Sequence, residues 1–141
     1  MNWKKPHRYL RLLSPIYSFI VQLHRSIYEW KILVPFRPHQ ATLVLGNLHS
    51  GGTGKTPFAI STFLWLTELG YNPVFLTRGY GGEEDGPTEV KGFHTHLNVG
   101  DEALLLSKVG ITIVAKNRAK GAKFIENYKN NFDIIIMDDG L

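Results

Sequence analysis

The segment from Gly46 to Pro57 contains the residue types that hold a nucleotide triphosphate. It reads Gly-Asn-Leu-His-Ser-Gly-Gly-Thr-Gly-Lys-Thr-Pro, and it lies between an apolar run and a helix-like run. Glycines let backbone N–H groups turn toward phosphate oxygens, and the N-terminus of the following helix adds partial positive charge. In such loops the lysine reaches the terminal phosphates and the hydroxyl next to it holds Mg²⁺. Nucleotide contacts are therefore expected along the loop, from His49, Ser50, Gly51, Gly52, Thr53, Gly54, Lys55 and Thr56.

The loop departs from the strict pattern G-x-x-x-x-G-K-[ST], because His49 stands where the first glycine belongs. Gly46, Gly51 and Gly52 supply flexibility elsewhere in the same segment. The alternative is a glycine-rich turn that ends in Lys-Thr by chance. The flanking strand-like and helix-like runs favour the nucleotide site, because the mechanism requires both.

Carboxylates follow two later elements. Asp138 and Asp139 end an apolar strand, where a carboxylate of this class of site organises Mg²⁺. The alternative is an acidic turn, for which Asp-Asp-Gly is also suitable. Asp101 and Glu102 stand at an expected helix start, where the helix dipole stabilises negative charge. They are equally consistent with a general base for a substrate hydroxyl and a neighbouring acid near the metal.

Two arginines and the histidines complete the residues that could carry chemistry. Arg78 and Arg118 each follow a predicted strand and are placed either to bind phosphate or to remain solvated at the sheet edge. His94 and His96 would share one face of a strand, but no third ligand accompanies them, so zinc is not expected. The chain contains no cysteine, which excludes a disulfide framework and a thiolate metal site.

Alternating elements predict an α/β fold, with a parallel sheet of the P-loop NTPase type flanked by helices. Ligands of such sheets bind beyond the carboxyl ends of the strands. Four groups are expected to meet there: the loop of Lys55, the turn that begins at Arg78, the pair Asp101-Glu102 and the pair Asp138-Asp139. Residues 88–99 are ambiguous and are compatible with a short hairpin. The other patterns predict strands over residues 41–46, 73–77, 111–115 and 133–137, and helices over residues 56–69, 100–108 and 117–130.

The positive charge is concentrated in the first 40 of the 141 residues. Residues 1–40 hold seven Lys or Arg and one Glu, whereas residues 41–141 carry a net charge of −2. Apolar residues from Ile16 to Trp30 recur at steps of three and four, which predicts an amphipathic helix. The uncharged stretch of this region, from Leu12 to Leu23, is shorter than the roughly 20 residues of a membrane-spanning helix.

This charge distribution favours a division of the chain into two regions with different roles. Residues 1–40 would be a basic, membrane-associating segment and linker, and residues 41–141 an incomplete nucleotide-binding core. We expect residues 8–33 to lie at a membrane surface with the bases toward anionic lipid. The alternative is a helix packed on the body of the protein. Nucleic acid is not an expected partner, because the aromatic residues lie among aliphatic residues and not among the bases.

The order of five blocks resembles the tetraacyldisaccharide 4′-kinase family, the lipid A 4′-kinases of Gram-negative bacteria, in its N-terminal part only. The resemblance covers the chain from the basic segment to the last residue. The blocks are Val44 to Asn47, Gly51 to Pro57, Thr77 to Gly82, Val99 to Ala103 and Asp138 to Leu141.

The resemblance implies ATP- and Mg²⁺-dependent phosphorylation of the 4′-hydroxyl of a tetraacyldisaccharide 1-phosphate, at the cytoplasmic face of the inner membrane. By position it implies that Lys55 is catalytic and that Asp101 is the base for the acceptor hydroxyl. It places Arg78 and Arg118 near phosphates. The metal contacts that it implies are Thr56, Glu102, Asp138 and Asp139.

Members of this family are about twice as long as this chain, and here an apolar strand runs directly into the last acidic turn. We therefore expect a truncated form of a longer protein and weak or absent activity in the 141 residues alone. Two other hypotheses are open. One is a different membrane-peripheral P-loop ATPase, and the other is a membrane-binding remnant without catalysis.

Overall fold

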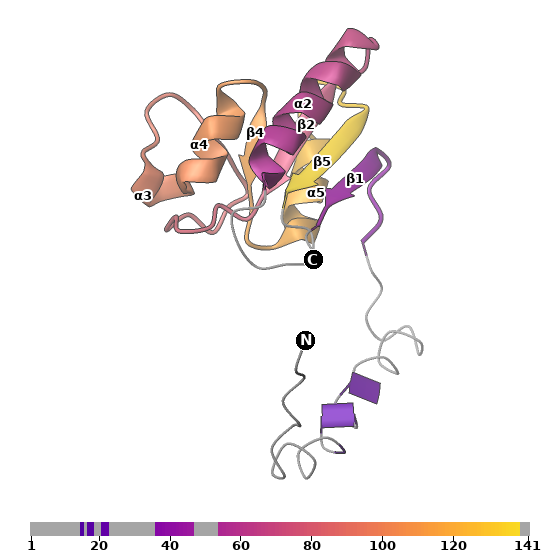
Figure 1. The fold of residues 1–141 in the computed structure, drawn as a ribbon, viewed down its shortest axis with the longest axis vertical. Coiled ribbons are helices and arrows are strands. Elements are labelled where there is room, and N and C mark those ends of the chain that lie inside the picture. Colours follow the sequence, from indigo (N-terminus) through magenta and orange to yellow (C-terminus); the bar gives the residue numbers. More distant parts are fainter. Residues whose placement is uncertain (1–14, 16, 19–20, 23–35, 47–53, 139–141) are drawn as a thin grey trace, which may run out of the picture. The chain divides into compact units, whose positions relative to one another are not determined.

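The computed structural model describes residues 15, 17–18, 21–22, 36–46 and 54–138 (Figure 1). The chain divides into two compact units, residues 1–36 and residues 37–141. In the first unit, residues 15, 17–18 and 21–22 are helical and exposed. Most of residues 8–33, the segment expected to lie at a membrane surface, is outside the described residues, so its membrane role stays a prediction. Within the described part of the chain, no helix has the length and apolar character needed to cross a membrane.

The second unit is built on a five-stranded sheet with the order β1-β5-β2-β4-β3. Neighbours among β1, β5, β2 and β4 run parallel, whereas β3 pairs antiparallel with β4. The predicted parallel α/β sheet is thus confirmed as a mostly parallel one. The hairpin considered for residues 88–99 is wrong, because β3 pairs with β4 and the later part of that segment forms a helix. The strands are β1 (Ala41–Leu45), β2 (Pro73–Thr77), β3 (Thr88–Glu89), β4 (Thr112–Val114) and β5 (Ile134–Asp138).

The helices begin and end at identifiable residues. They are α2 (Lys55–Glu68), α3 (His96–Val99), α4 (Asp101–Ser107) and α5 (Arg118–Glu126). α5 starts where the Asn117 side chain accepts a hydrogen bond from the Lys120 N–H. It stops four residues before the predicted end. There the Asn127 side chain donates to the Lys123 carbonyl at 2.8 Å, and Tyr128 packs beside Phe132 with ring centroids 5.5 Å apart.

Side chains that alternate along the strands place a helical layer on each face of the sheet. On one face, Phe75 and Ile136 pack with residues of α2 and α4, including Phe63, whose ring stacks on Phe75 at 4.6 Å. On the other face, Leu76 and Ile135 pack with Ile125 of α5. Both layers leave the carboxyl ends of the parallel strands free of helix, at the side where α2 begins (Figure 1).

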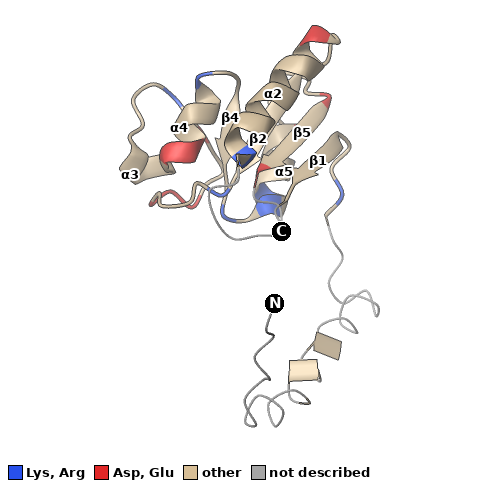
Figure 2. Cartoon of the chain, viewed as in Figure 1, with Lys and Arg blue, Asp and Glu red and all other residues tan. Residues whose placement is uncertain are grey.

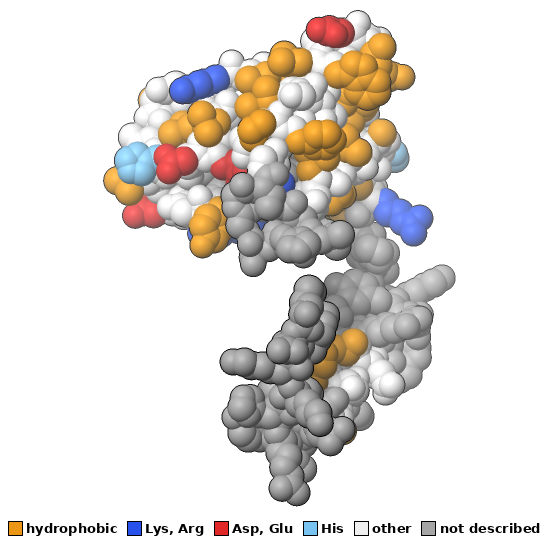
Figure 3. Space-filling model, in the orientation of Figure 1, with side chains coloured by type: hydrophobic (Ala, Val, Ile, Leu, Met, Phe, Trp, Pro, Cys, Tyr) orange, Lys and Arg blue, Asp and Glu red, His pale blue; other side chains and the backbone are white. Residues whose placement is uncertain are grey.

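β1 is an edge strand of the sheet, because its one neighbour among the described strands is β5. Leu43 and Val44 are 39% and 45% exposed. Beside the sheet, α2 also presents apolar side chains to solvent, with Phe58 62% and Trp65 59% exposed. Figure 3 shows hydrophobic side chains gathered on this face of the second unit.

Candidate active site

The sheet register brings two expected site segments to the same level. β1 and β5 are parallel neighbours, and Leu45 at the end of β1 is paired with Asp138 at the end of β5. The glycine-rich loop therefore leaves the sheet beside Asp138. Arg78 follows β2, the other neighbour of β5, and is exposed. The carboxyl ends of three adjacent strands thus surround one region, where α/β proteins bind their ligands.

The N-terminus of α2 has several features of an anion site. Gly54 precedes it in the left-handed conformation, with φ 75° and ψ 22°, which glycine adopts without strain. The first turn carries no acidic residue, and within the described part of the chain no side chain caps it. Lys55 and Thr56 begin the helix and are half-buried. This end combines helix-dipole charge with a lysine, as an anion site requires. The loop residues before it, His49, Ser50, Gly51, Gly52 and Thr53, lie outside the described residues.

A hydroxyl and two carboxylates from three elements meet next to this helix end. The Thr56 hydroxyl of α2 donates a hydrogen bond to Oε1 of Glu102 in α4. The Glu102 side chain in turn shares a hydrogen bond with Asp138 of β5. Asp138 is fully buried, whereas Glu102 and Thr56 are half-buried. We call Thr56, Glu102 and Asp138 the carboxylate cluster.

The electrostatics of the carboxylate cluster follow from burial and like charge. Burial raises the pKa of the Asp138 carboxyl to about 6, and the charge and hydrogen bond of Glu102 act in the same direction. The positive charges of Lys55 and Arg118 oppose this increase in pKa. A buried carboxyl beside another carboxylate favours a proton or a cation in its surroundings.

One guanidinium group contacts the cluster, and a second acts electrostatically on the first. Nη2 of Arg118, near the start of α5, donates to the Asp138 carbonyl oxygen at 3.5 Å. The pKa of Arg118 is lowered by burial and then by the positive charge of Arg78, while Asp138 acts in the opposite direction. Two cations that repel each other across a site favour an anion between them. Figure 2 shows basic and acidic positions side by side at this end of the sheet.

Asp101 is the first residue of α4 and is exposed. It precedes Glu102 directly and is not one of the three residues of the cluster. The start of α4 therefore presents one carboxylate to the cluster and another to solvent. Asp139 lies outside the described residues.

The donor set of the cluster fits Mg²⁺. Mg²⁺ prefers oxygen ligands and is commonly held by one or two carboxylates, with water and phosphate completing its coordination. Thr56, Glu102 and Asp138 supply a hydroxyl and two carboxylates. Among the described residues, no group of three or more His, Cys, Asp or Glu side chains could hold a metal by itself. The cluster would therefore need oxygens from a bound phosphate or from water.

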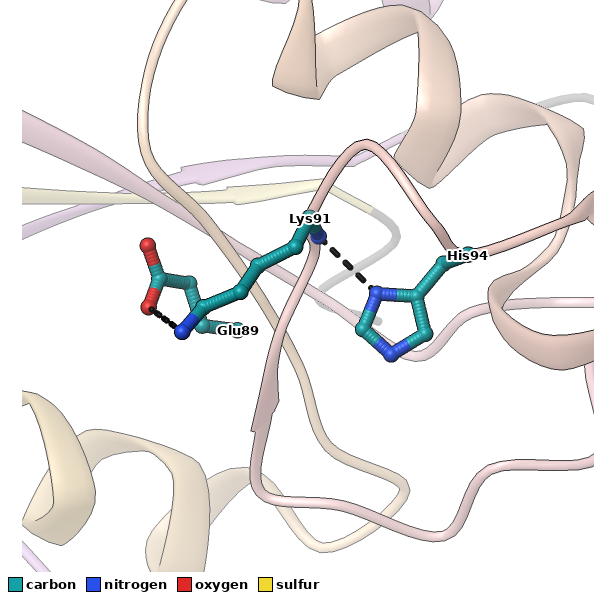
Figure 4. Close-up of polar contacts among 3 residues, drawn as sticks. All are labelled: Glu89, Lys91 and His94. Carbon is teal, nitrogen blue, oxygen red and sulfur yellow. Dashed lines mark hydrogen bonds and ion pairs between the residues drawn. The ribbon is translucent and has the colours of Figure 1, made fainter.

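His94 and His96 lie in and just before α3 and are not residues of the carboxylate cluster. Nδ1 of His94 accepts a hydrogen bond from the Lys91 N–H at 2.9 Å. The Lys91 ammonium lies 3.5 Å from a carboxylate oxygen of Glu89, as Figure 4 shows. His96 begins α3, so His94 and His96 do not share a strand. His94 thus stabilises a turn, and the expectation that zinc is not bound here stays a prediction.

Sequence reasoning missed one feature of the site. The glycines at positions 79, 82 and 100 bring the turn after β2 into backbone contact with the residues before α4. The closely spaced glycines after β2 predict a turn, but they do not predict which segment that turn contacts, because the two segments are distant in the sequence.

Three comparisons relate the chain to known proteins. A family model described as "LpxK: Tetraacyldisaccharide-1-P 4'-kinase" matches residues 6–141. Among curated proteins, the tetraacyldisaccharide 4'-kinase of Idiomarina loihiensis is 36% identical over 147 residues, covering 99% of this chain and 45% of the relative. The enzyme of the same name from Methylorubrum extorquens is 40% identical over 142 residues, covering 99% of this chain and 42% of the relative.

A solved structure has the same fold. The crystal structure described as the "apo" form of LpxK from Aquifex aeolicus in complex with ATP matches with a TM-score of 0.72 and 25% identity. The match covers 93% of this chain and 43% of that chain. This chain therefore spans less than half the length of the relatives that it matches.

Proposed function

This chain belongs to the tetraacyldisaccharide-1-P 4'-kinase family, and we propose that it forms the nucleotide-binding part of a lipid kinase. The reaction is transfer of the terminal phosphoryl group of ATP to the 4′-hydroxyl of a tetraacyldisaccharide 1-phosphate, in lipid A biosynthesis. The observation that carries the proposal is the carboxylate cluster, which is located at the uncapped start of α2. Phosphoryl transfer requires this combination of anion site and oxygen ligands.

The nucleotide phosphates are bound where α2 begins. In the proposed site Lys55 would contact the terminal phosphates, and the residues from His49 to Gly54 would supply backbone N–H donors. Arg78 and Arg118 neutralise the charge that spreads over the transferred group. A relative with the same fold is described as a complex with ATP, which supports a bound nucleotide, and sheets of this kind bind ligands at the carboxyl ends of their strands.

Thr56, Glu102 and Asp138 would hold the metal, and the family resemblance adds Asp139 as a further acid. When bound, Mg²⁺ neutralises charge on the phosphates and completes the electrostatic site. The raised pKa of Asp138 supports a cation here, because a buried carboxyl beside Glu102 gains most from a positive partner. Phosphate oxygens and water would supply the further oxygens that such an ion prefers.

Asp101 acts as the base for the acceptor. Its exposed carboxylate takes the proton of the sugar hydroxyl as that oxygen forms its bond to the terminal phosphorus. The bond between this phosphorus and the bridging oxygen breaks at the same centre, and its electrons leave with ADP. Lys55 stabilises the charge that develops on the phosphates. The neighbouring Glu102 stays with the metal, so adjacent acids serve different atoms.

The acceptor of the proposed reaction is a lipid, so a membrane-binding N-terminal region would bring the enzyme to its substrate. We propose that residues 8–33 bind the cytoplasmic face of the inner membrane of a Gram-negative bacterium, where the acylated disaccharide is presented. In this arrangement residues 1–40 are the membrane-associating part and residues 41–141 the nucleotide-binding core.

A phosphate-transfer assay tests the function. A protein that contains this sequence within a family-length chain is given labelled ATP, Mg²⁺ and the tetraacyldisaccharide 1-phosphate, and label on the lipid is measured. We expect Asp101→Asn to lower kcat by about 100-fold or more while ATP binding is retained. Glu68→Gln is the matched control, because it removes an exposed carboxylate at the other end of α2.

The outcomes separate the candidates. Label on the lipid that depends on Asp101 supports the kinase. ATP hydrolysis without any effect of the lipid would instead indicate a membrane-peripheral ATPase. No binding of ATP at millimolar concentration would leave a non-catalytic membrane-binding protein.

A further inference from the structure

We propose that Gly79, Gly82 and Gly100 together are positioning residues that set the start of α4, and with it Glu102, against the rest of the site. We call the contact among these three glycines and their neighbours the glycine interlock. The inference rests on the proposed function for its kinetic consequence. Its geometric basis is independent of that function.

The glycine interlock packs backbone against backbone. A Cβ added at Gly82 would lie 2.6 Å from the carbonyl oxygen of Asn98 and 2.8 Å from the backbone nitrogen of Gly100. A Cβ added at Gly100 would collide with the carbonyl oxygen of Tyr80. Real Cβ atoms essentially never approach other heavy atoms within 3.0 Å, and a backbone atom cannot swing aside as a flexible side chain does. Either added methyl group must therefore separate the two segments.

Hydrogen bonds hold the same two segments together. The Glu83 N–H donates to the Leu97 carbonyl and the Glu84 N–H to the Asn98 carbonyl, each at 2.9 Å. The residues before Gly100 are themselves ordered by a capping box in α3, in which the Asn98 side chain accepts from the backbone and the hydroxyl of Thr95 at 2.9 Å. The position of the turn after β2 against the α3–α4 junction is thus fixed both by close packing of the two backbones and by directional hydrogen bonds between them.

One side of the glycine interlock is anchored to the sheet. Gly79 follows Arg78 directly and has φ +67°. A Cβ at this position would lie 2.6 Å from Cγ1 of Val114, a buried residue of β4, and 2.8 Å from the carbonyl oxygen of Val99. The turn therefore touches the core on one side and the residues before α4 on the other.

The other side of the glycine interlock leads to the carboxylate cluster. Gly100 is the residue before α4, with φ 84° and ψ 153°, and Glu102 follows two positions later. Glu102 is the residue of α4 that contacts both Thr56 and Asp138. A displacement of Gly100 is therefore passed to a side chain that bridges two other elements. Misplacement of about 1 Å in an active site can reduce the rate about 100-fold.

Gly82→Ala is the informative variant. Gly82 does not have a positive φ, so alanine meets no backbone strain there and the substitution adds only the clash. Gly92→Ala is the matched control, since it also lacks a positive φ and a Cβ there would have no heavy atom within 4 Å. Both are made in the family-length protein that contains this sequence, and kcat, KM for ATP and the half-saturating Mg²⁺ concentration are measured.

We expect Gly82→Ala to lower kcat by about 10- to 100-fold and to raise the Mg²⁺ requirement. KM for ATP should change by less than about threefold, because the start of α2 is not part of the glycine interlock. Gly92→Ala should match the unchanged protein. A Gly82→Ala enzyme that folds and has the kcat of the unchanged protein would overturn the proposal, as would a loss confined to KM for ATP.

A second variant covers a failure of Gly82→Ala to fold. Asn98→Ala removes the capping-box acceptor without adding any atom, and thermal unfolding verifies that it folds. A several-fold lower kcat at unchanged KM for ATP supports the glycine interlock, and an unchanged kcat overturns it.

A binding measurement separates this proposal from the proposed function. If the unchanged protein phosphorylates no lipid acceptor, the kinase function is wrong. The glycine interlock is then judged by titrating Mg²⁺ in the presence of a non-hydrolysable ATP analogue. Weaker Mg²⁺ binding in Gly82→Ala than in Gly92→Ala supports it, and equal binding overturns it.

Discussion

Replacing the buried acid of the cluster should stabilise the metal-free protein. Asp138 is fully buried, and its pKa is raised from 3.8 to about 6 by burial and by Glu102. At neutral pH the Asp138 carboxyl is therefore ionised in the folded protein, although its surroundings disfavour the ionised form. Asp138→Asn removes this charge, and the amide remains able to donate to the Glu102 carboxylate.

The sign and size of the effect follow from proton linkage. Between the unfolded pKa of 3.8 and the folded pKa of about 6, the folded state binds more protons at Asp138 than the unfolded state. The free energy of unfolding therefore falls as pH rises through this window. This decrease in the free energy of unfolding is complete above the folded pKa and amounts to about 1–3 kcal/mol. The groups that face Asp138 are Glu102 from α4, Lys55 from α2 and Arg118 from α5, and only Glu102 acts with burial to raise its pKa.

Denaturant unfolding at several pH values measures this difference. With metal removed by a chelator, Asp138→Asn should be about as stable as the unchanged protein near pH 4. It should gain stability up to about pH 6, and hold a constant advantage above that pH. Glu68→Gln, which removes an exposed carboxylate at the far end of α2, should show no such rise. An advantage that is absent at pH 7.5, or that does not change between pH 4 and pH 7, would refute the reasoning.

Two further predictions concern the hydroxyl of the cluster and the core beneath it. Thr56→Ala should weaken Mg²⁺ binding and lower kcat by about 10- to 100-fold, whereas Thr56→Ser keeps the hydroxyl that donates to Glu102 and should retain most activity. Equal losses in a kinase assay of the two variants would contradict a role for the hydroxyl. Phe63→Ala should cost about 3–5 kcal/mol in denaturant unfolding, because Phe63 is 8% exposed and stacks on Phe75. Phe58→Ala, at a residue 62% exposed on the same helix, should cost about 0.5 kcal/mol or less, and similar costs for the two would argue against this packing.

The sequence predicted best the elements with strong local signals. β2 has the predicted bounds, because Val74, Phe75 and Leu76 form an apolar run and Gly70 marks the turn before it. α5 was predicted too long, because the pattern continues past Asn127 while the side chain of that residue ends the helix. β3 could not be predicted, since two residues carry no periodicity and the strand exists only through its pairing with β4.

The candidate site could be predicted as a region but not as a set of contacts. Parallel strands place Lys55, Arg78 and Asp138 at one edge of the sheet, and this much follows from topology. The bond from Thr56 to Glu102 depends on how two helices pack on the same face of the sheet, which no local pattern records. The roles assigned to the individual residues remain predictions for the assays above.

The pairing of β1 also has a consequence for the order of folding. Among the described strands β1 bonds only to β5, and Ala41 at its start is matched with Ile134, so most of the chain separates the partners. Closing so large a loop is entropically expensive, and such contacts form slowly. During synthesis the first strand must wait until the last of these strands has left the ribosome. The carboxyl ends of β1 and β5, where Leu45 is paired with Asp138, should therefore become ordered in a single late event.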